Sequence, residues 1–108
     1  MRKLLALAAT LVLLALFTSA IASGSKRTAK VGDDYLSPGK LTISRGTLVT
    51  WRWQGTTDEE HNVRDLKHRF GSKTQMAGVF RYRFRKAGKY TVVCTIHPTA
   101  MREKIVVK

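Results

Sequence analysis

The chain has 108 residues, a formal net charge of +13 and one cysteine. This length fits one small domain, and a single cysteine excludes a framework of intrachain disulfides. The positive charge predicts anionic neighbours, such as acidic proteins or anionic membrane surfaces.

The first residues have the pattern of an export signal. Arg2 and Lys3 precede an apolar run at residues 4–17, and the following "TSAIAS" has the small residues that signal peptidase prefers. We therefore predict a signal peptide at residues 1–22 and a periplasmic or extracellular protein of the cell envelope. A retained membrane anchor is the alternative, although its apolar run is shorter than the about 20 residues that a spanning helix needs. Loss of Arg2 and Lys3 lowers the net charge by two, to +11, and export makes nucleic acid an unsuitable partner.

Residues 23–30 are polar and basic, and we expect them to form a flexible leader before a folded domain at residues 31–108. Within that domain apolar and polar residues alternate, which places them on opposite faces of β-strands. The three clearest apolar faces are Val49, Trp51 and Trp53; Phe80, Tyr82 and Phe84; and Tyr90, Val92 and Cys94. The segments "LTIS" and "KIVVK" predict two further strands, and turns with Gly or Pro separate these runs. The pattern is typical of an all-β sandwich or barrel.

The segment "CTIHPTAM" places a thiol, an imidazole and a thioether in one loop, on Cys94, His97 and Met101. The short connection keeps these groups close with little further loss of chain entropy. His61, in "EEHNV", is the best candidate for a fourth ligand, because a long loop returns to a strand there. The loop offers no hard oxygen ligands for calcium or magnesium, and zinc rarely binds methionine. Two histidines, a cysteine and a weak axial methionine are the ligands of blue-copper electron-transfer sites.

Each of these residues also has an ordinary explanation when it is taken singly. A lone cysteine is commonly a small buried hydrophobe, a histidine a surface residue and a methionine a core filler. Together, in an exported β protein, the four residues favour one copper ion that cycles between Cu(I) and Cu(II). His68, in the basic segment "LKHRF", has no matching partner groups, and we expect it to be solvated. A copper carrier that hands on the ion is the alternative function, and a metal-free adhesion domain is a third.

Long stretches of the chain resemble a small cupredoxin of the plastocyanin, amicyanin and pseudoazurin type. The resemblance rests on "YLSPGKLTISRGTLVTWRW", "HNV", "GVFRYRFRKAGKYTVVCTIHP" and "MREKIVV", and it covers about residues 31–108. Its most specific part is a histidine followed by G-x-Y-x-x-x-C-x-x-H and then a methionine. The resemblance implies a Greek-key β-sandwich of seven to eight strands. It also implies that His61, Cys94 and His97 are the strong copper ligands and that Met101 is the weak axial one.

The resemblance further implies supporting residues and a function. Asn62 matches the asparagine that ties the two ligand loops together, and Thr95 is its expected partner. Such contacts outside the ligand set fix the direction of the ligands, although Asn62 could also be an ordinary turn residue. Members of this family shuttle single electrons between larger redox proteins. We therefore expect a monomeric electron carrier and not an enzyme.

Two departures from the family pattern affect the expected site. Three residues separate His97 from Met101, where plant plastocyanins have one more and amicyanins one fewer. The length of the axial bond and the reduction potential are therefore left open. Val93 stands where plant plastocyanins have a tyrosine for remote electron entry. The exposed edge of His97 is then the expected electron path.

The basic residues of "VFRYRFR" offer a docking region. Arg81, Arg83 and Arg85 alternate along this strand and would form a basic stripe on one face. We expect the stripe to attract acidic redox proteins, membrane-bound electron-transfer complexes or an anionic membrane surface. A solvated face that protects against edge pairing is the alternative.

Overall fold

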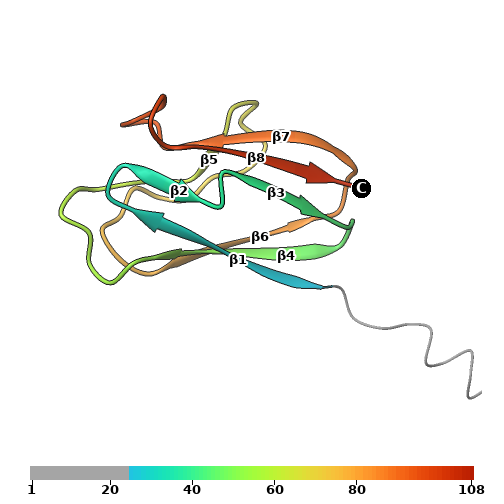
Figure 1. Ribbon diagram of the computed structural model, residues 1–108, viewed down its shortest axis with the longest axis horizontal. Helices are drawn as coiled ribbons and strands as arrows, with labels where there is room; N and C mark the ends of the chain where they lie inside the picture. The colour runs from blue at the N-terminus through green and yellow to red at the C-terminus, as the bar shows by residue number, and fades with distance from the viewer. Residues whose placement is uncertain (1–24) are drawn as a thin grey trace, which may run out of the picture.

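The computed structural model describes residues 25–108, which form a sandwich of two β-sheets (Figure 1). In chain order the strands are β1 (Lys26–Gly32), β2 (Tyr35–Ser37), β3 (Lys40–Ile43), β4 (Thr47–Trp53), β5 (Arg64–Asp65), β6 (Val79–Phe84), β7 (Gly88–Val93) and β8 (Arg102–Val107). The predicted all-β sandwich of seven to eight strands is confirmed. Within the described range there is no helix long and apolar enough to cross a membrane.

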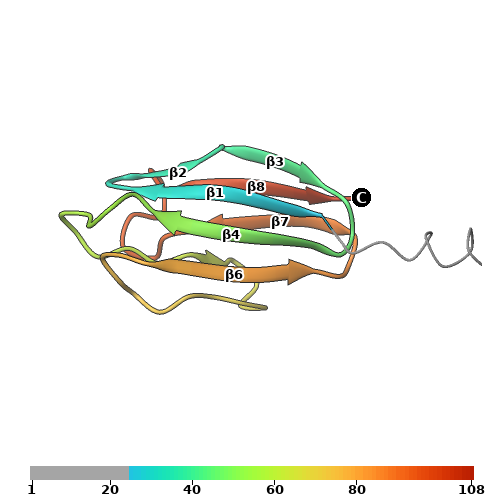
Figure 2. The same ribbon diagram turned by 90° about the horizontal axis from the view of Figure 1, so that it is seen from below.

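Each sheet has four strands. The first has the order β2-β1-β4-β6 (Figure 2), and the second has the order β3-β8-β7-β5. Strand β1 runs parallel to β4 and β3 runs parallel to β8, whereas the other neighbours are antiparallel. The chain changes sheet at every connection from β2 to β7, and it stays within one sheet only between β1 and β2 and between β7 and β8, as in a Greek-key sandwich.

Aromatic side chains fill much of the space between the sheets. Strand β4 contributes Val49, Trp51 and Trp53, which are all buried as the alternation predicts. Phe80 and Tyr82 are only partly buried, because β6 lies at the edge of its sheet. The centroids of the Trp51 and Phe80 rings are 5.7 Å apart and the rings are tilted. Such aromatic pairs stabilise a core beyond the area that they bury.

The start of the domain differs from the prediction. Residues 26–30, which we expected within a flexible leader, form most of β1, so that expectation is wrong for them. This strand pairs with β4, and its residues Ala29 and Val31 are fully buried. Its other residues are mostly exposed lysine, arginine and threonine, and they give the segment the composition of a leader. The predicted signal peptide at residues 1–22 lies outside the described residues.

The loops that carry the predicted ligands gather at one end of the sandwich. Strands β4 and β7 end there and β8 begins there (Figure 1), since Val93 pairs with Arg102 across the last two strands. Residues 66–78 contain no helix and return towards this end through an isolated bridge between Gln75 and His61. The rigid sheets therefore support a cluster of irregular loops.

Candidate metal centre

His61 is buried where the long loop after β4 returns to the core. Its backbone N–H donates to the carbonyl of Gln75 at 3.0 Å, and the Gln75 N–H donates back to the His61 carbonyl at 2.9 Å. The His61 side chain has no exposed surface. The paired backbone bonds fix the direction in which the imidazole leaves the chain.

The other predicted ligands lie in the loop between β7 and β8. The Cys94 N–H donates to the Met101 carbonyl at 3.1 Å, and the Met101 N–H donates to the His97 carbonyl at 2.9 Å. These bonds close the loop on itself. Cys94 and Met101 are fully buried, whereas the His97 side chain is 27% exposed. His97 is therefore the predicted ligand that reaches the surface.

Cys94 and His61 meet inside the protein. The Cys94 Sγ atom lies 4.0 Å from His61 Nδ1, and the rings of His61 and His97 have centroids 5.5 Å apart. Bonds of about 2.0 to 2.3 Å from one metal ion to nitrogen and sulfur leave the two ligand atoms at most about 4.3 Å apart. The distance between Cys94 and His61 therefore fits a shared ion. A thiolate with imidazoles and a thioether suits copper better than calcium or magnesium, which need oxygen ligands.

Asn62 joins the two ligand loops. Its Oδ1 accepts a hydrogen bond from the Thr95 backbone N–H at 3.0 Å, and its Nδ2 donates to Thr95 Oγ1 at 2.8 Å. The same Nδ2 also donates to Thr74 Oγ1 at 3.1 Å. The expected contact between Asn62 and Thr95 is thus present, and it holds the residue next to Cys94 in place.

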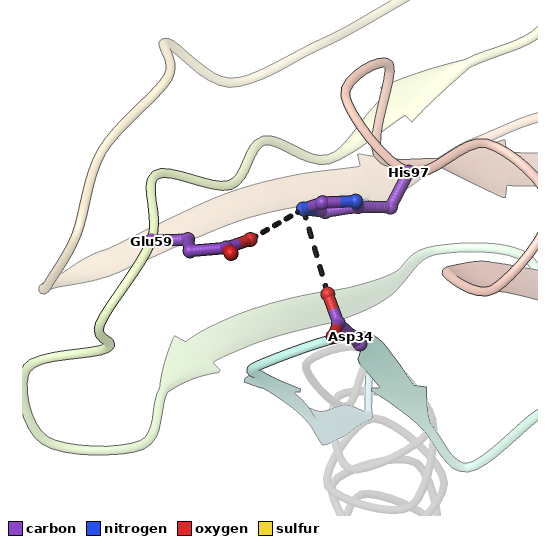
Figure 3. Close-up of side chains that lie close together, drawn as sticks. All are labelled: Asp34, Glu59 and His97. Atoms are coloured by element: carbon purple, nitrogen blue, oxygen red, sulfur yellow. Dashed lines mark hydrogen bonds and ion pairs between the residues drawn. The ribbon is translucent and has the colours of Figure 1, made fainter.

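A carboxylate lies against the outer nitrogen of each histidine. His61 Nε2 is 2.9 Å from Asp33 Oδ1. His97 Nε2 is 2.8 Å from Glu59 Oε2 and 3.5 Å from Asp34 Oδ1 (Figure 3). A carboxylate in this position fixes the ring and makes its other nitrogen a stronger ligand.

The surroundings of His97 differ from the expected ligand cluster. Among residues 25–108, Asp34, Glu59 and His97 are the one group of three acidic, histidine or cysteine side chains whose ligand atoms all lie within 4.8 Å. Its two carboxylates are 62% and 58% exposed. His61, Cys94 and His97 do not all approach one another this closely. The structure thus brings the predicted ligands to one end of the protein, with His97 turned towards the acidic side chains.

Two carboxyl groups near the site have altered acidity. The hydrogen bond with His61, followed by that from the Asp58 backbone, lowers the pKa of Asp33. Burial raises the pKa of Glu103 to about 7, although its hydrogen bond with Trp51 acts in the opposite direction. This bond runs from Trp51 Nε1 to Glu103 Oε1 at 2.9 Å and connects the two sheets. Asp33 is therefore held as an anion, and Glu103 is held largely neutral below neutral pH.

The acidic residues at this end of the protein were not among the predicted site residues. Five of the seven acidic residues lie in two short segments, "GDDY" and "TDEEH". These five are Asp33, Asp34, Asp58, Glu59 and Glu60. Their concentration in a basic chain is a signal that the sequence contains. The sequence does not show that Asp33, Asp34 and Glu59 contact the histidines, because those contacts require the turn between β1 and β2 to lie beside the loop after β4.

The remaining predicted residues lie away from the ligand loops. His68 is exposed, as expected. Arg81 and Arg85 are exposed, but Arg83 is partly buried and donates to the Gly46 carbonyl at 2.8 Å. Strand β6 begins at the ligand end and runs away from it, so the arginines lie along the middle and the far end of the sandwich (Figure 1).

Comparisons of the sequence with known proteins agree with this architecture. A family model described as a cupredoxin-like domain matches residues 4–107. No curated protein sequence matches the chain.

Solved structures with a similar fold include several copper proteins. A novel purple cupredoxin from Nitrosopumilus maritimus has a TM-score of 0.66 at 22% identity, with 76% of this chain and 99% of that chain covered. An oxidised amicyanin mutant has a TM-score of 0.65 at 23% identity, with 82% and 86% covered. A copper-containing nitrite reductase from Thermus scotoductus SA-01 has a TM-score of 0.66 at 23% identity, with 77% of this chain covered. The match spans only 22% of the reductase chain. At these identities the likenesses show the fold.

Proposed function

The chain belongs to the cupredoxin-like domain family, and from this premise we propose that it is an exported blue copper protein. In this proposal it passes single electrons between redox partners and is not itself an enzyme. His61, Cys94 and His97 hold one copper ion, and Met101 is the weak axial ligand.

One observation carries the proposal. The Cys94 thiol and the His61 Nδ1 atom lie 4.0 Å apart, and both side chains are fully buried. His97 and Met101 follow on the same short loop and add an imidazole and a thioether. Copper accepts these three kinds of ligand, and when bound it supplies a one-electron couple between Cu(I) and Cu(II).

The residues of the chain keep such a site in one shape. Asn62 holds the start of the ligand loop through Thr95, and backbone bonds to Gln75 fix His61. Ligands that are held by packing and hydrogen bonds move little when an electron arrives or leaves, so the barrier to transfer stays low. The partly exposed His97 supplies the path from the site to the surface.

A copper carrier is the second candidate, and the acidic group beside His97 favours it. Asp34 and Glu59 are exposed and lie within reach of the same ring nitrogen. Exposed carboxylates attract cations from solution and would give an ion a route towards the buried thiol. A carrier would need the ion to leave by this route as easily as it enters.

We propose acidic redox proteins, membrane-bound electron-transfer complexes or an anionic membrane surface as the partners. The net charge of the chain and the exposed Arg81 and Arg85 favour this choice. The acidic residues around His97 disfavour an acidic contact at the ligand end itself. The exposed arginines would then attract an acidic partner over a distance, and electron transfer would take place at the His97 end.

Addition of Cu(II) to the purified apoprotein tests the proposal. We expect an intense blue colour from thiolate-to-copper charge transfer and a reversible one-electron wave in voltammetry. Cys94→Ser should lose the colour, whereas the control His68→Gln should keep it because His68 is exposed and away from the loop. A pale or colourless copper adduct would favour the carrier. Failure to bind copper would favour a metal-free domain.

A further inference from the structure

The Asp33 carboxylate contacts a buried histidine and two backbone donors. Its Oδ1 lies 2.9 Å from His61 Nε2 and accepts from the Glu59 N–H at 3.3 Å, and its Oδ2 accepts from the Asp58 N–H at 3.0 Å. The Asp33 side chain is 40% exposed, whereas the His61 side chain has no exposed surface. The carboxylate therefore closes the outer side of a ring that is otherwise inside the protein.

The hairpin between β1 and β2 fixes the place of Asp33. Gly32 pairs with Tyr35, so the hairpin has a connection of only two residues. The Tyr35 ring lies so close over Gly32 that a β-carbon at this position would collide with it. Asp33 thus links a tight hairpin to the loop that leads to His61.

The donors around Asp33 decide which ring nitrogen of His61 carries the proton. Two of these donors are backbone N–H groups, which cannot change their role, and an ionised carboxylate only accepts. His61 Nε2 therefore donates to Asp33. Nδ1, which faces Cys94 Sγ at 4.0 Å, keeps its lone pair. Metal-binding histidines are commonly oriented by such a partner on the other ring nitrogen.

We propose that Asp33 is the positioning residue of this centre. It holds His61 in the tautomer that presents the Nδ1 lone pair beside Cys94, and it places a negative charge that favours the more highly charged copper ion. The part of this inference that concerns copper rests on the proposed function. The part that concerns the tautomer is a property of the protein without metal.

Asp33→Asn is the variant that separates charge and hydrogen bonding from shape. The amide has nearly the same size, but its NH₂ group has to face either the His61 nitrogen or a backbone N–H. The first arrangement reverses the tautomer, and the second brings two donors together. Asp58→Asn is the matched control, because it removes the same charge from an exposed side chain while the Asp58 contact with Asp33 is made by the backbone.

Nitrogen-15 NMR of the apoprotein measures the tautomer directly. We expect His61 of the wild type to carry its proton on Nε2, and we expect the share with a proton on Nδ1 to rise in Asp33→Asn but not in Asp58→Asn. A wild-type His61 that carries its proton mainly on Nδ1 would overturn the proposal without any variant. Equal tautomer populations in the two variants would overturn it as well.

Copper titrations and voltammetry test the second part. Asp33→Asn should lower the Cu(II) affinity about 10–100-fold, as is usual for loss of such a partner. The fold-decrease in the Cu(I) affinity should be about ten times smaller than the fold-decrease in the Cu(II) affinity. This tenfold change in the ratio of the two affinities raises the reduction potential by about 59 mV. Asp58→Asn should change the ratio of the two affinities by less than about threefold, because its charge is exposed and screened. Equal changes in both variants would show that Asp33 only ties loops together. If the wild type binds no copper, the proposed function fails, and the tautomer comparison still decides whether Asp33 positions His61.

Discussion

Replacement of Glu103 by glutamine should remove a large part of the dependence of stability on pH. Glu103 is 1% exposed, and its Oε1 accepts the hydrogen bond from Trp51 at 2.9 Å. Its Oε2 has no hydrogen-bond partner among the described residues. Burial raises the pKa of this carboxyl from 4.5 to about 7, and unfolding returns it to water and to its ordinary value.

This difference makes the folded protein less stable as the pH rises. Below the unfolded pKa of 4.5 the group is protonated in both states, and its favourable contribution is complete. Between this value and about 7 the unfolded chain loses the proton while the folded protein keeps it, so the free energy of unfolding falls. The loss reaches about 3 kcal/mol above the folded pKa, because each pKa unit is worth about 1.4 kcal/mol.

Urea unfolding of the apoprotein at about pH 5 and about pH 8 measures this effect. The contribution of Glu103 to the free energy of unfolding should fall by about 2–3 kcal/mol between the two conditions. Glu103→Gln should lack this fall, whereas the control Glu60→Gln, at an exposed position, should keep it. The quantity compared is the change in the free energy of unfolding between the two pH values. The cost of burying the new amide is the same at both pH values, so it cancels in this difference. Equal changes in wild type and Glu103→Gln would mean that Glu103 is already ionised in the fold, and the reasoning would be refuted.

Three further variants have distinct expected results. Met101→Leu should keep copper binding and raise the reduction potential, since a thioether helps Cu(II) more than an apolar side chain does; complete loss of copper in a titration would make Met101 a main ligand instead. Asn62→Ala should lower the free energy of unfolding by about 1–3 kcal/mol, because it removes the acceptor of the Thr95 N–H; an unchanged urea midpoint would contradict this. The double variant Arg81→Glu with Arg85→Glu should slow electron transfer to an acidic partner at low salt and weaken the dependence of this rate on salt. The reduction potential should not change. Identical salt slopes in stopped-flow kinetics would show that these arginines are only a solvated face.

The strands that could be predicted are those with one apolar and one polar face over several residues. Strand β4 met this condition, as did β6 and β7. Strand β1 did not, because its fully buried apolar side chains are only Ala29 and Val31 and its exposed residues dominate its composition. Strands β2 and β5 have three and two residues, which is too short to show a period. Pairing with neighbours, which the sequence does not display, defines these elements.

In the candidate site, too, residues that lie close together in the sequence could be predicted, whereas residues that only the fold brings together could not. Cys94 and Met101 could be proposed as ligands from their spacing in one loop, and the family resemblance predicted the contact between Asn62 and Thr95. Asp33 could not be found, because it meets a histidine 28 residues further along the chain through an unrecognised hairpin. The burial of Glu103 could have been predicted, because the alternation in "REKIVV" places Glu103 on the same face as the buried residues of β8.

The parallel pairing of β1 with β4 has a practical consequence for attaching the protein to a support. Lys26 pairs with Leu48 at the end of the sandwich far from the ligand loops, and the last residue, Lys108, lies at that end too, beside Ile43. A tether fixed to Lys108 or ahead of Ser25 will therefore hold the molecule at the end opposite the ligand loops (Figure 1) and leave the partly exposed His97 accessible to solution. If the protein carries copper as proposed, molecules attached to an electrode in this way should exchange electrons slowly with the electrode. They should exchange electrons readily with redox proteins in solution. A tether at an introduced cysteine in place of exposed Thr99, beside the His97 edge, should reverse this preference.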